Sequence, residues 1–175
     1  MTMFQTFHLD QRGTAATEFA AAAMFVVIGV LNAVDLGLYE YQRMEVENAA
    51  QVGAQAAWKQ CNDTSSMLPA TLNCSGLNSA TSAALQSTSL GNAVSLTSGY
   101  PAEGYYCVNL TGVLQRVGSP SSRPSDCSAA GNPNANPGDY LQVGVTYAYS
   151  PLFAGLSIMG AGPSAITMIT WMRLG

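Results

Sequence analysis

The feature that most constrains this chain is a run of 20 largely apolar residues, Phe19 to Leu38, near its start. At the standard helical rise, a helix of this length extends about 30 Å, which is the thickness of the hydrocarbon core of a bilayer. Only two polar residues, Asn32 and Asp35, interrupt the run, and both lie near its far end. The sequence therefore predicts a membrane-spanning helix over residues 19–38.

The residues on either side of this run favour one orientation but leave the kind of segment open. Arg12 precedes the run and a net acidic stretch follows it, which favours a cytoplasmic N-terminus. A cleaved secretory signal would need a basic head and a shorter apolar core, whereas the head here, residues 1–13, is neutral. A plain signal anchor remains compatible with the run, and so does a membrane helix that is processed in another way.

Charge is scarce in the chain as a whole. Six basic and ten acidic side chains give 9% charged residues and a net charge of −4, compared with about 25% charged residues in an ordinary soluble domain. Nucleic-acid-binding modules usually carry a basic patch or stripe. We therefore expect no nucleic-acid partner.

The boundary between the polar head and the apolar run has a particular order of residues. Gly13 ends the head, and a single acid, Glu18, is the fifth residue after it. A carboxylate at the edge of a membrane helix is costly unless it finds a partner, so it indicates a function. This pattern resembles the processing site of type IV prepilins. The chain is most similar to TadE-like pilins of the tight-adherence (Tad, Flp) systems, over RGTAATEFA (12–20), LGLYEYQRMEVENAAQVGAQAA (36–57) and YLQVGVTYAYSPLFAG (140–155).

The resemblance implies a set of partners and roles. A prepilin peptidase of the bacterial inner membrane would cut between Gly13 and Thr14, and Glu18 would neutralise an N-terminal amine during assembly. Other pilin subunits and the Tad assembly machinery would be the further partners. Residue 14 is Thr rather than the aromatic of many type IV pilins, which leaves N-methylation open. The C-terminal domain would be periplasmic, or extracellular in the assembled pilus.

The helical pattern continues beyond the membrane span. Between Thr14 and Val52 there is no proline, and only two glycines occur. A stripe of mostly small residues then recurs at helical spacing, at Val46, Ala49, Ala50, Gly53 and Ala57. We predict one helix over residues 14–58, whose second half lays this stripe against the domain that follows.

Residues 59–175 predict a β-rich outer domain. A short helix is expected over 78–90, and strands over 93–98, 105–117, 140–149 and 165–173, with the strict alternation of 140–149 the strongest of these signals. No long helices separate the strands, so an antiparallel sheet follows. The fold class is α+β, with a long N-terminal helix packed on a small antiparallel sheet, and this arrangement is pilin-like. Two loops remain, a proline-rich one over 118–139 and an apolar one over 151–163, which is either a subunit-contact patch or a cover for the core.

Four cysteines lie beyond the membrane span, and an even number in an exported domain indicates disulfides. Three pairings are open in principle, and we favour Cys61–Cys74 with Cys107–Cys127 because each closes a local loop. The chain has no CxxC and its one histidine, His8, lies in the leader, so neither a zinc site nor a Ser–His or Cys–His pair is expected. We expect neither an enzyme nor a cofactor.

The sequence thus predicts a prepilin leader (1–13), an N-terminal helix (14–58) and an extracytoplasmic domain (59–175), acting as a minor pilin or pseudopilin. Two other interpretations stay open. One is a signal-anchored periplasmic binding domain unrelated to pili, which needs neither Gly13 nor Glu18. The other is a pseudopilin of type II secretion, which keeps the processing step but serves another machine.

Overall fold

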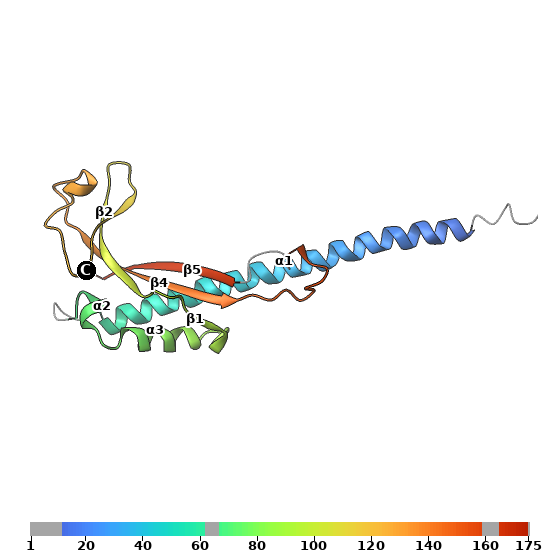
Figure 1. Ribbon diagram of the computed structural model, residues 1–175, viewed down its shortest axis with the longest axis horizontal. Helices are drawn as coiled ribbons and strands as arrows, with labels where there is room; N and C mark the ends of the chain where they lie inside the picture. Colours follow the sequence, from blue (N-terminus) through green and yellow to red (C-terminus); the bar gives the residue numbers. More distant parts are fainter. Residues whose placement is uncertain (1–11, 62–66, 159–164, 175) are drawn as a thin grey trace, which may run out of the picture. The chain divides into compact units, whose positions relative to one another are not determined.

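The computed structural model describes residues 12–61, 67–158 and 165–174, so most of the predicted leader lies outside the described residues. The chain forms two compact units: residues 1–40 with 150–163, and residues 41–149 with 164–175. We call the first the anchor unit and the second the sheet unit. A single helix, α1 (Arg12–Cys61), belongs to the anchor unit over its first part and to the sheet unit over its second (Figure 1).

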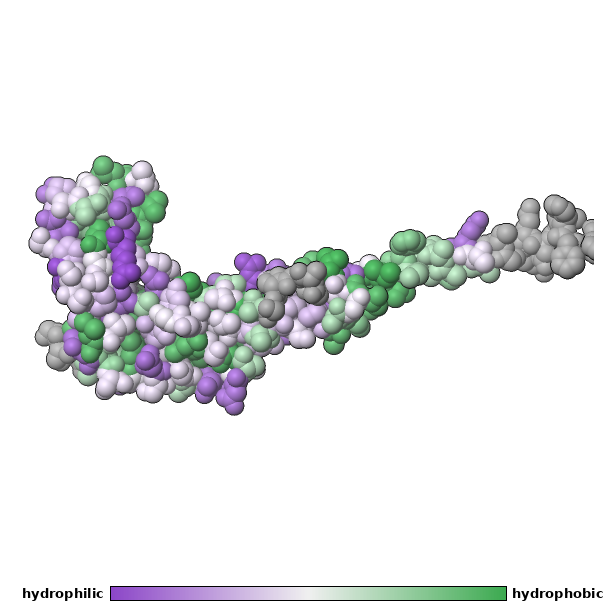
Figure 2. Space-filling model, in the orientation of Figure 1, coloured by the Kyte–Doolittle hydropathy of each residue, from purple (hydrophilic) through white to green (hydrophobic). Residues whose placement is uncertain are grey.

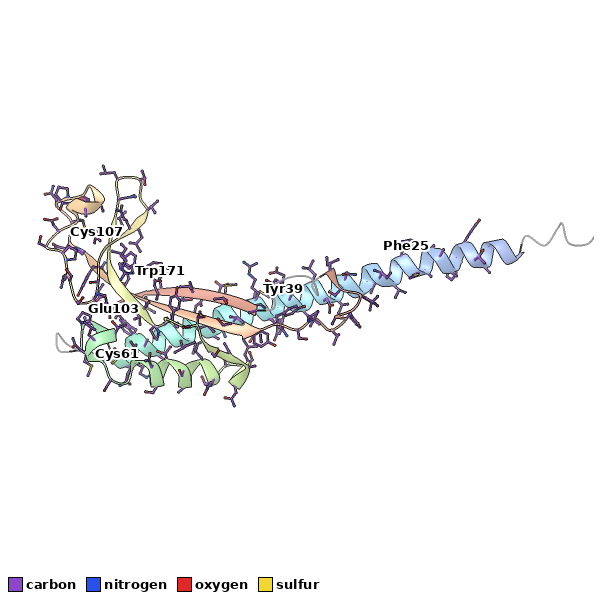
Figure 3. The ribbon with its side chains drawn as sticks, in the orientation of Figure 1. Phe25, Tyr39, Cys61, Glu103, Cys107 and Trp171 are labelled. Carbon is purple, nitrogen blue, oxygen red and sulfur yellow. A yellow bond between two sulfur atoms is a disulfide. The ribbon has the colours of Figure 1, made fainter. Side chains whose placement is uncertain are left out.

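The anchor unit contains the first part of α1 and a segment far along the chain, within residues 150–163. Apolar side chains cover this part of the helix and are exposed, among them Phe19 at 75% and Phe25 at 77%. Figure 2 shows it as a mainly hydrophobic surface, and Figure 3 labels Phe25 on it. Among the described residues, α1 is the one helix long and apolar enough to cross a membrane.

The sheet unit combines the second part of α1 with two shorter helices and five strands. The helices are α2 (Ala70–Asn73) and α3 (Leu77–Gln86). The strands are β1 (Val94–Leu96), β2 (Ala102–Val108), β3 (Leu114–Gly118), β4 (Gly138–Ala148) and β5 (Ala165–Arg173). The long helix packs against this antiparallel sheet, which confirms the predicted α+β class.

Strand β4 is the centre of the sheet because it is the longest and has neighbours on both edges. Along one edge it pairs with β5 over nine residue pairs, from Tyr140↔Arg173 to Ala148↔Ala165. Along the other edge it pairs first with β2 and then with β1, and β2 continues the sheet to β3. Every pairing is antiparallel, as the sequence predicts.

The core of the sheet unit lies between one face of the sheet and the small-residue stripe of α1. Leu141, Val143 and Val145 of β4 alternate along the strand and are fully buried. The predicted stripe of α1 is buried as well, and Gly53 within it lies against Leu85 of α3. The stripe therefore packs against two neighbours, the sheet, as the sequence predicts, and helix α3.

One predicted strand, 105–117, is wrong as a single element. The structure divides it into β2 and β3, joined by a turn in which Asn109 Oδ1 accepts hydrogen bonds from the amide nitrogens of Thr111 and Val113. Gly112 has a φ of +81°, a left-handed conformation that glycine adopts without strain. The turn chemistry of Asn109 and Gly112 thus ends β2, although apolar residues continue on both sides.

Two disulfides brace the sheet unit, in the pairs that we favour from the sequence. Cys61, the last residue of α1, is bonded to Cys74, and Cys107 of β2 is bonded to Cys127. The second bond fixes part of the proline-rich loop against the sheet, where Cys107, Cys127 and Ala130 form a small buried cluster. Figure 3 labels Cys61 and Cys107.

Candidate functional site

The predicted processing boundary lies in the first turns of α1. Gly13 and Thr14 are both helical, and Glu18 follows Thr14 by four residues. Residues four apart are neighbours on one helix face, so the carboxylate lies one turn from the position of a new Thr14 amine. The side chain of Glu18 is exposed. None of the described residues therefore covers the Glu18 carboxylate, to which the resemblance gives a role in assembly.

A second polar feature lies towards the end of the apolar span. Asp35 is fully buried, although the helix residues on both sides of it are exposed. Its Oδ1 accepts a hydrogen bond of 3.0 Å from the amide of Leu152, and its Oδ2 one of 3.3 Å from the amide of Phe153. From the sequence alone, Asp35 either pairs with a neighbouring subunit or, as we favour, marks the point where the helix leaves the lipid. The structure adds partners within the chain, 117 and 118 residues away in the sequence.

Asn32, one turn earlier, holds the same segment. Its Oδ1 accepts a hydrogen bond of 2.7 Å from the amide of Ile158, and its Nδ2 donates to the carbonyl oxygens of Leu156 and Ile28. The two side chains together bind both ends of residues 151–158, which we call the apolar turn. The rest of the predicted loop, 159–163, lies outside the described residues.

The apolar turn exposes its side chains rather than burying them. Leu152, Leu156 and Ile158 are 65%, 57% and 69% exposed. The sequence left two interpretations of this loop open, a subunit-contact patch and a cover for the core. Because these three side chains are exposed, they do not cover the core. The signal that could have identified this contact is the pair Asn32 and Asp35, two hydrogen-bonding side chains three residues apart on one helix face in an otherwise apolar run.

The sheet unit contains a separate pair of acids. Glu103 of β2 and Asp139 of β4 are each 5% exposed. The Glu103 carboxylate accepts hydrogen bonds from the amides of Ala70 and Thr71, at 2.8 and 2.7 Å, and so caps α2. The two carboxylate oxygens of Asp139 are buried without a hydrogen-bond donor. Figure 3 labels Glu103.

Asp139 is the strongly perturbed acid of the sheet unit. Burial, and then the negative charge of Glu103, raises the pKa of Asp139 to about 7, against the opposing effect of Arg123. Burial raises the pKa of the neighbouring Tyr105 as well, and the Arg123 guanidinium lies 5.5 Å from the centre of the Tyr105 ring. When protonated, the Asp139 carboxyl can donate a hydrogen bond to the Glu103 carboxylate, which explains how two acids share this buried position.

Aromatic side chains line the opposite face of the same strands. Tyr106 makes edge-to-face contacts with Tyr140 and Trp171, with ring centres 5.8 and 5.0 Å apart, and its hydroxyl accepts a hydrogen bond from Gln142. Trp171 is 46% exposed and is labelled in Figure 3. In residues 12–61, 67–158 and 165–174, no three His, Cys, Asp or Glu side chains come together as a metal site.

Comparison with protein-family models, curated proteins and solved structures finds no match to this chain. The TadE-like interpretation therefore remains a prediction from the residues of the chain itself, above all from Gly13, Glu18 and the helix that follows them.

Proposed function

We propose that this chain is a minor pilin or pseudopilin of the TadE-like group, which is processed after Gly13 and takes part in assembling a Tad-type adherence pilus. The observation that carries the proposal is the position of Gly13 and Glu18 at the start of one uninterrupted helix. The first part of that helix exposes apolar side chains, and its second part is buried against a disulfide-braced sheet. A pilin needs both properties in a single helix.

The proposed mechanism is assembly rather than turnover. Cleavage after Gly13 leaves 162 residues (175 − 13) and creates an α-amino group on Thr14. In a lipid-like environment neither this amine nor the Glu18 carboxylate is well solvated, so the two charges attract strongly. The exposed apolar part of α1 then packs with the corresponding helices of other subunits.

The disulfides support the proposed orientation. Such bonds persist in oxidising compartments such as the periplasm and are rare in the cytosol. All four cysteines follow the apolar span, and all four are bonded. In the proposed orientation, with a cytoplasmic N-terminus and a periplasmic sheet unit, all four cysteines lie in an oxidising compartment. The position of Arg12 before the span favours the same orientation.

Intact-mass measurement of the protein extracted from membranes tests the proposal. In cells with an active prepilin peptidase, we expect the mass of residues 14–175, and in cells lacking the peptidase that of residues 1–175. A Gly13→Val variant should remain uncut. Gly37→Val is the matched control, because a side chain at Gly37 meets nothing within 4 Å, and it should be processed normally. An uncut wild-type chain would support the signal-anchored alternative instead.

A further inference from the structure

The apolar turn, residues 151–158, combines two properties that rarely occur together in a loop. Leu152, Leu156 and Ile158 are apolar and exposed, and the turn contains no charged residue. Its backbone is nevertheless tied firmly to α1 within the anchor unit, through Asn32 and Asp35. An ordinary water-facing loop would present polar side chains and leave its amides to water.

The backbone of the turn is largely satisfied without water. Of the seven amide groups from Leu152 to Ile158, five donate hydrogen bonds within the protein. Asp35 accepts two and Asn32 one, and the carbonyl oxygen of Phe153 accepts those of Leu156 and Ser157. Non-helical backbone is costly in hydrocarbon because unpaired amides find no partner there. These bonds remove most of that cost.

The turn lies beside the last part of the predicted span. Asp35 and Asn32 precede Leu38 by three and six residues, which places them about 5 Å and about 9 Å inside the end of the span. This is the depth, about 5–10 Å, to which interfacial segments enter a bilayer. The two polar side chains would themselves be costly at this depth, and their hydrogen bonds to the turn remove that cost as well.

We propose that the apolar turn is a membrane-insertion element. It enters the outer leaflet beside α1, with its backbone held by Asn32 and Asp35, and places Leu152, Leu156 and Ile158 in contact with lipid. This inference rests on the proposed function only in requiring that α1 spans a bilayer. The occupant is lipid because the turn is hydrogen-bonded to a stretch of the helix that is itself apolar and exposed, at Val27, Val30 and Val34.

Insertion of the turn would set the depth of the anchor. A bare helix can slide along the bilayer normal by a few ångströms at little cost. With the turn inserted, movement towards the periplasm would withdraw three aliphatic side chains from lipid, and the exposure of apolar surface to water is unfavourable. The chain would thus be held at one depth before it leaves the membrane for a pilus.

Spin-label accessibility in the full chain, reconstituted in phosphatidylethanolamine and phosphatidylglycerol vesicles, tests this inference. A nitroxide on Leu156→Cys should collide several-fold more often with oxygen, relative to a water-soluble nickel chelate, than one on Leu110→Cys, an exposed site of the sheet unit. A label on Phe25→Cys reports independently whether α1 is in the bilayer. Intact mass should show one label per chain, which excludes exchange with the native disulfides.

A second set of variants tests the role of the two polar side chains. With Asn32→Ala and Asp35→Ala together, the label at position 156 should become accessible to the nickel chelate, while the label at 25 stays in lipid. If the label at 156 stays in lipid in this variant, the proposed role of Asn32 and Asp35 is wrong.

The remaining outcomes separate the inference from its premise. A water-exposed label at 156 with a lipid-exposed label at 25 overturns the insertion of the turn but leaves the anchor intact. Protection of the label at 156 from both oxygen and nickel indicates cover by a second copy of the chain and also overturns it. A label at 25 outside the lipid overturns the membrane-spanning helix itself, and the insertion with it.

Discussion

Gly53 of α1 and Leu85 of α3 approach so closely that a Cβ atom at position 53 would lie 2.8 Å from Leu85 Cδ2. Leu85 is 1% exposed, and Thr81 Cγ2 lies 3.3 Å from the same point, so neither neighbour has free space into which to move. The small residue at 53 is therefore what permits α3 to lie against the long helix.

Gly53→Val should destabilise the sheet unit by about 1–3 kcal/mol, because overpacking forces side chains off their rotamers and shifts the backbone. Urea unfolding followed by tryptophan fluorescence measures the change in detergent-solubilised protein. Gly37→Val is the control, since it alters the same helix where nothing lies within 4 Å. Equal stability of the two variants would show that the contact between Gly53 and Leu85 does not limit packing.

Stability should fall as the pH rises from about 4 to about 7. The pKa of Asp139 is raised to about 7 in the folded chain, whereas an unperturbed aspartate in the unfolded chain titrates near about 3.9. Between these values the unfolded state releases a proton that the folded state keeps, so increasing pH favours unfolding. Above pH 7 the folded state ionises too, and this contribution to the pH dependence ends.

Asp139→Asn should remove most of this pH dependence and stabilise the chain at pH 8 by on the order of 1–2 kcal/mol, because the amide can donate to Glu103 without carrying charge. Urea midpoints at pH 5 and pH 8 provide the comparison. Asp126→Asn is a suitable control, because hydrogen bonds from Ser128 lower the pKa of that exposed acid instead. If the pH dependence of stability is unchanged in the Asp139→Asn variant, groups other than Asp139 cause it.

Removal of the Cys107–Cys127 bond, through Cys107→Ser with Cys127→Ser, should lower stability by about 2–4 kcal/mol. It should also loosen β3, which pairs with β2 beside Cys107, so trypsin should cut after Arg116 sooner than in the wild type. The matched control is Cys61→Ser with Cys74→Ser, which opens a comparable loop of 13 residues rather than 20. That variant should leave the rate of cleavage after Arg116 unchanged.

Glu18→Gln should separate processing from assembly. The peptidase site at Gly13 is unaltered, so the leader should still be removed, but the uncharged side chain no longer neutralises the Thr14 amine. We expect incorporation into sheared pili to fall by about tenfold or more, because a loss of 1.4 kcal/mol already changes an equilibrium tenfold. Glu47→Gln, on the exposed side of the same helix, should assemble normally. Normal assembly of the Glu18 variant would remove the role proposed for this carboxylate.

The sequence predicts those elements that depend on local periodicity. The absence of proline from residues 14–58 predicts one long helix, and the structure extends it only slightly, to Arg12–Cys61. The predicted strand 165–173 coincides with β5, because its β-branched residues continue without a turn signal until Arg173. Alternation along β4 likewise identifies the buried residues Leu141, Val143 and Val145.

Features that depend on distant contacts could not be predicted in this way. The short helix α2 is capped by Glu103, a residue more than 30 positions later, and no local sequence pattern predicts this helix. The contacts of Asp35 with Leu152 and Phe153 join segments more than 100 residues apart. Sequence periodicity describes which face of an element is apolar, but it does not say which later segment covers a given polar residue.

The order of the chain has a consequence for any attempt to make a soluble fragment. The apolar turn belongs to the anchor unit, yet it connects β4 to β5, so the chain enters the anchor unit twice. A fragment that begins at Tyr41 would keep the turn but lose Asn32 and Asp35, leaving three backbone amides without their acceptors beside exposed leucines. Such a fragment should aggregate unless residues 151–158 are replaced by a short polar connection between the two strands.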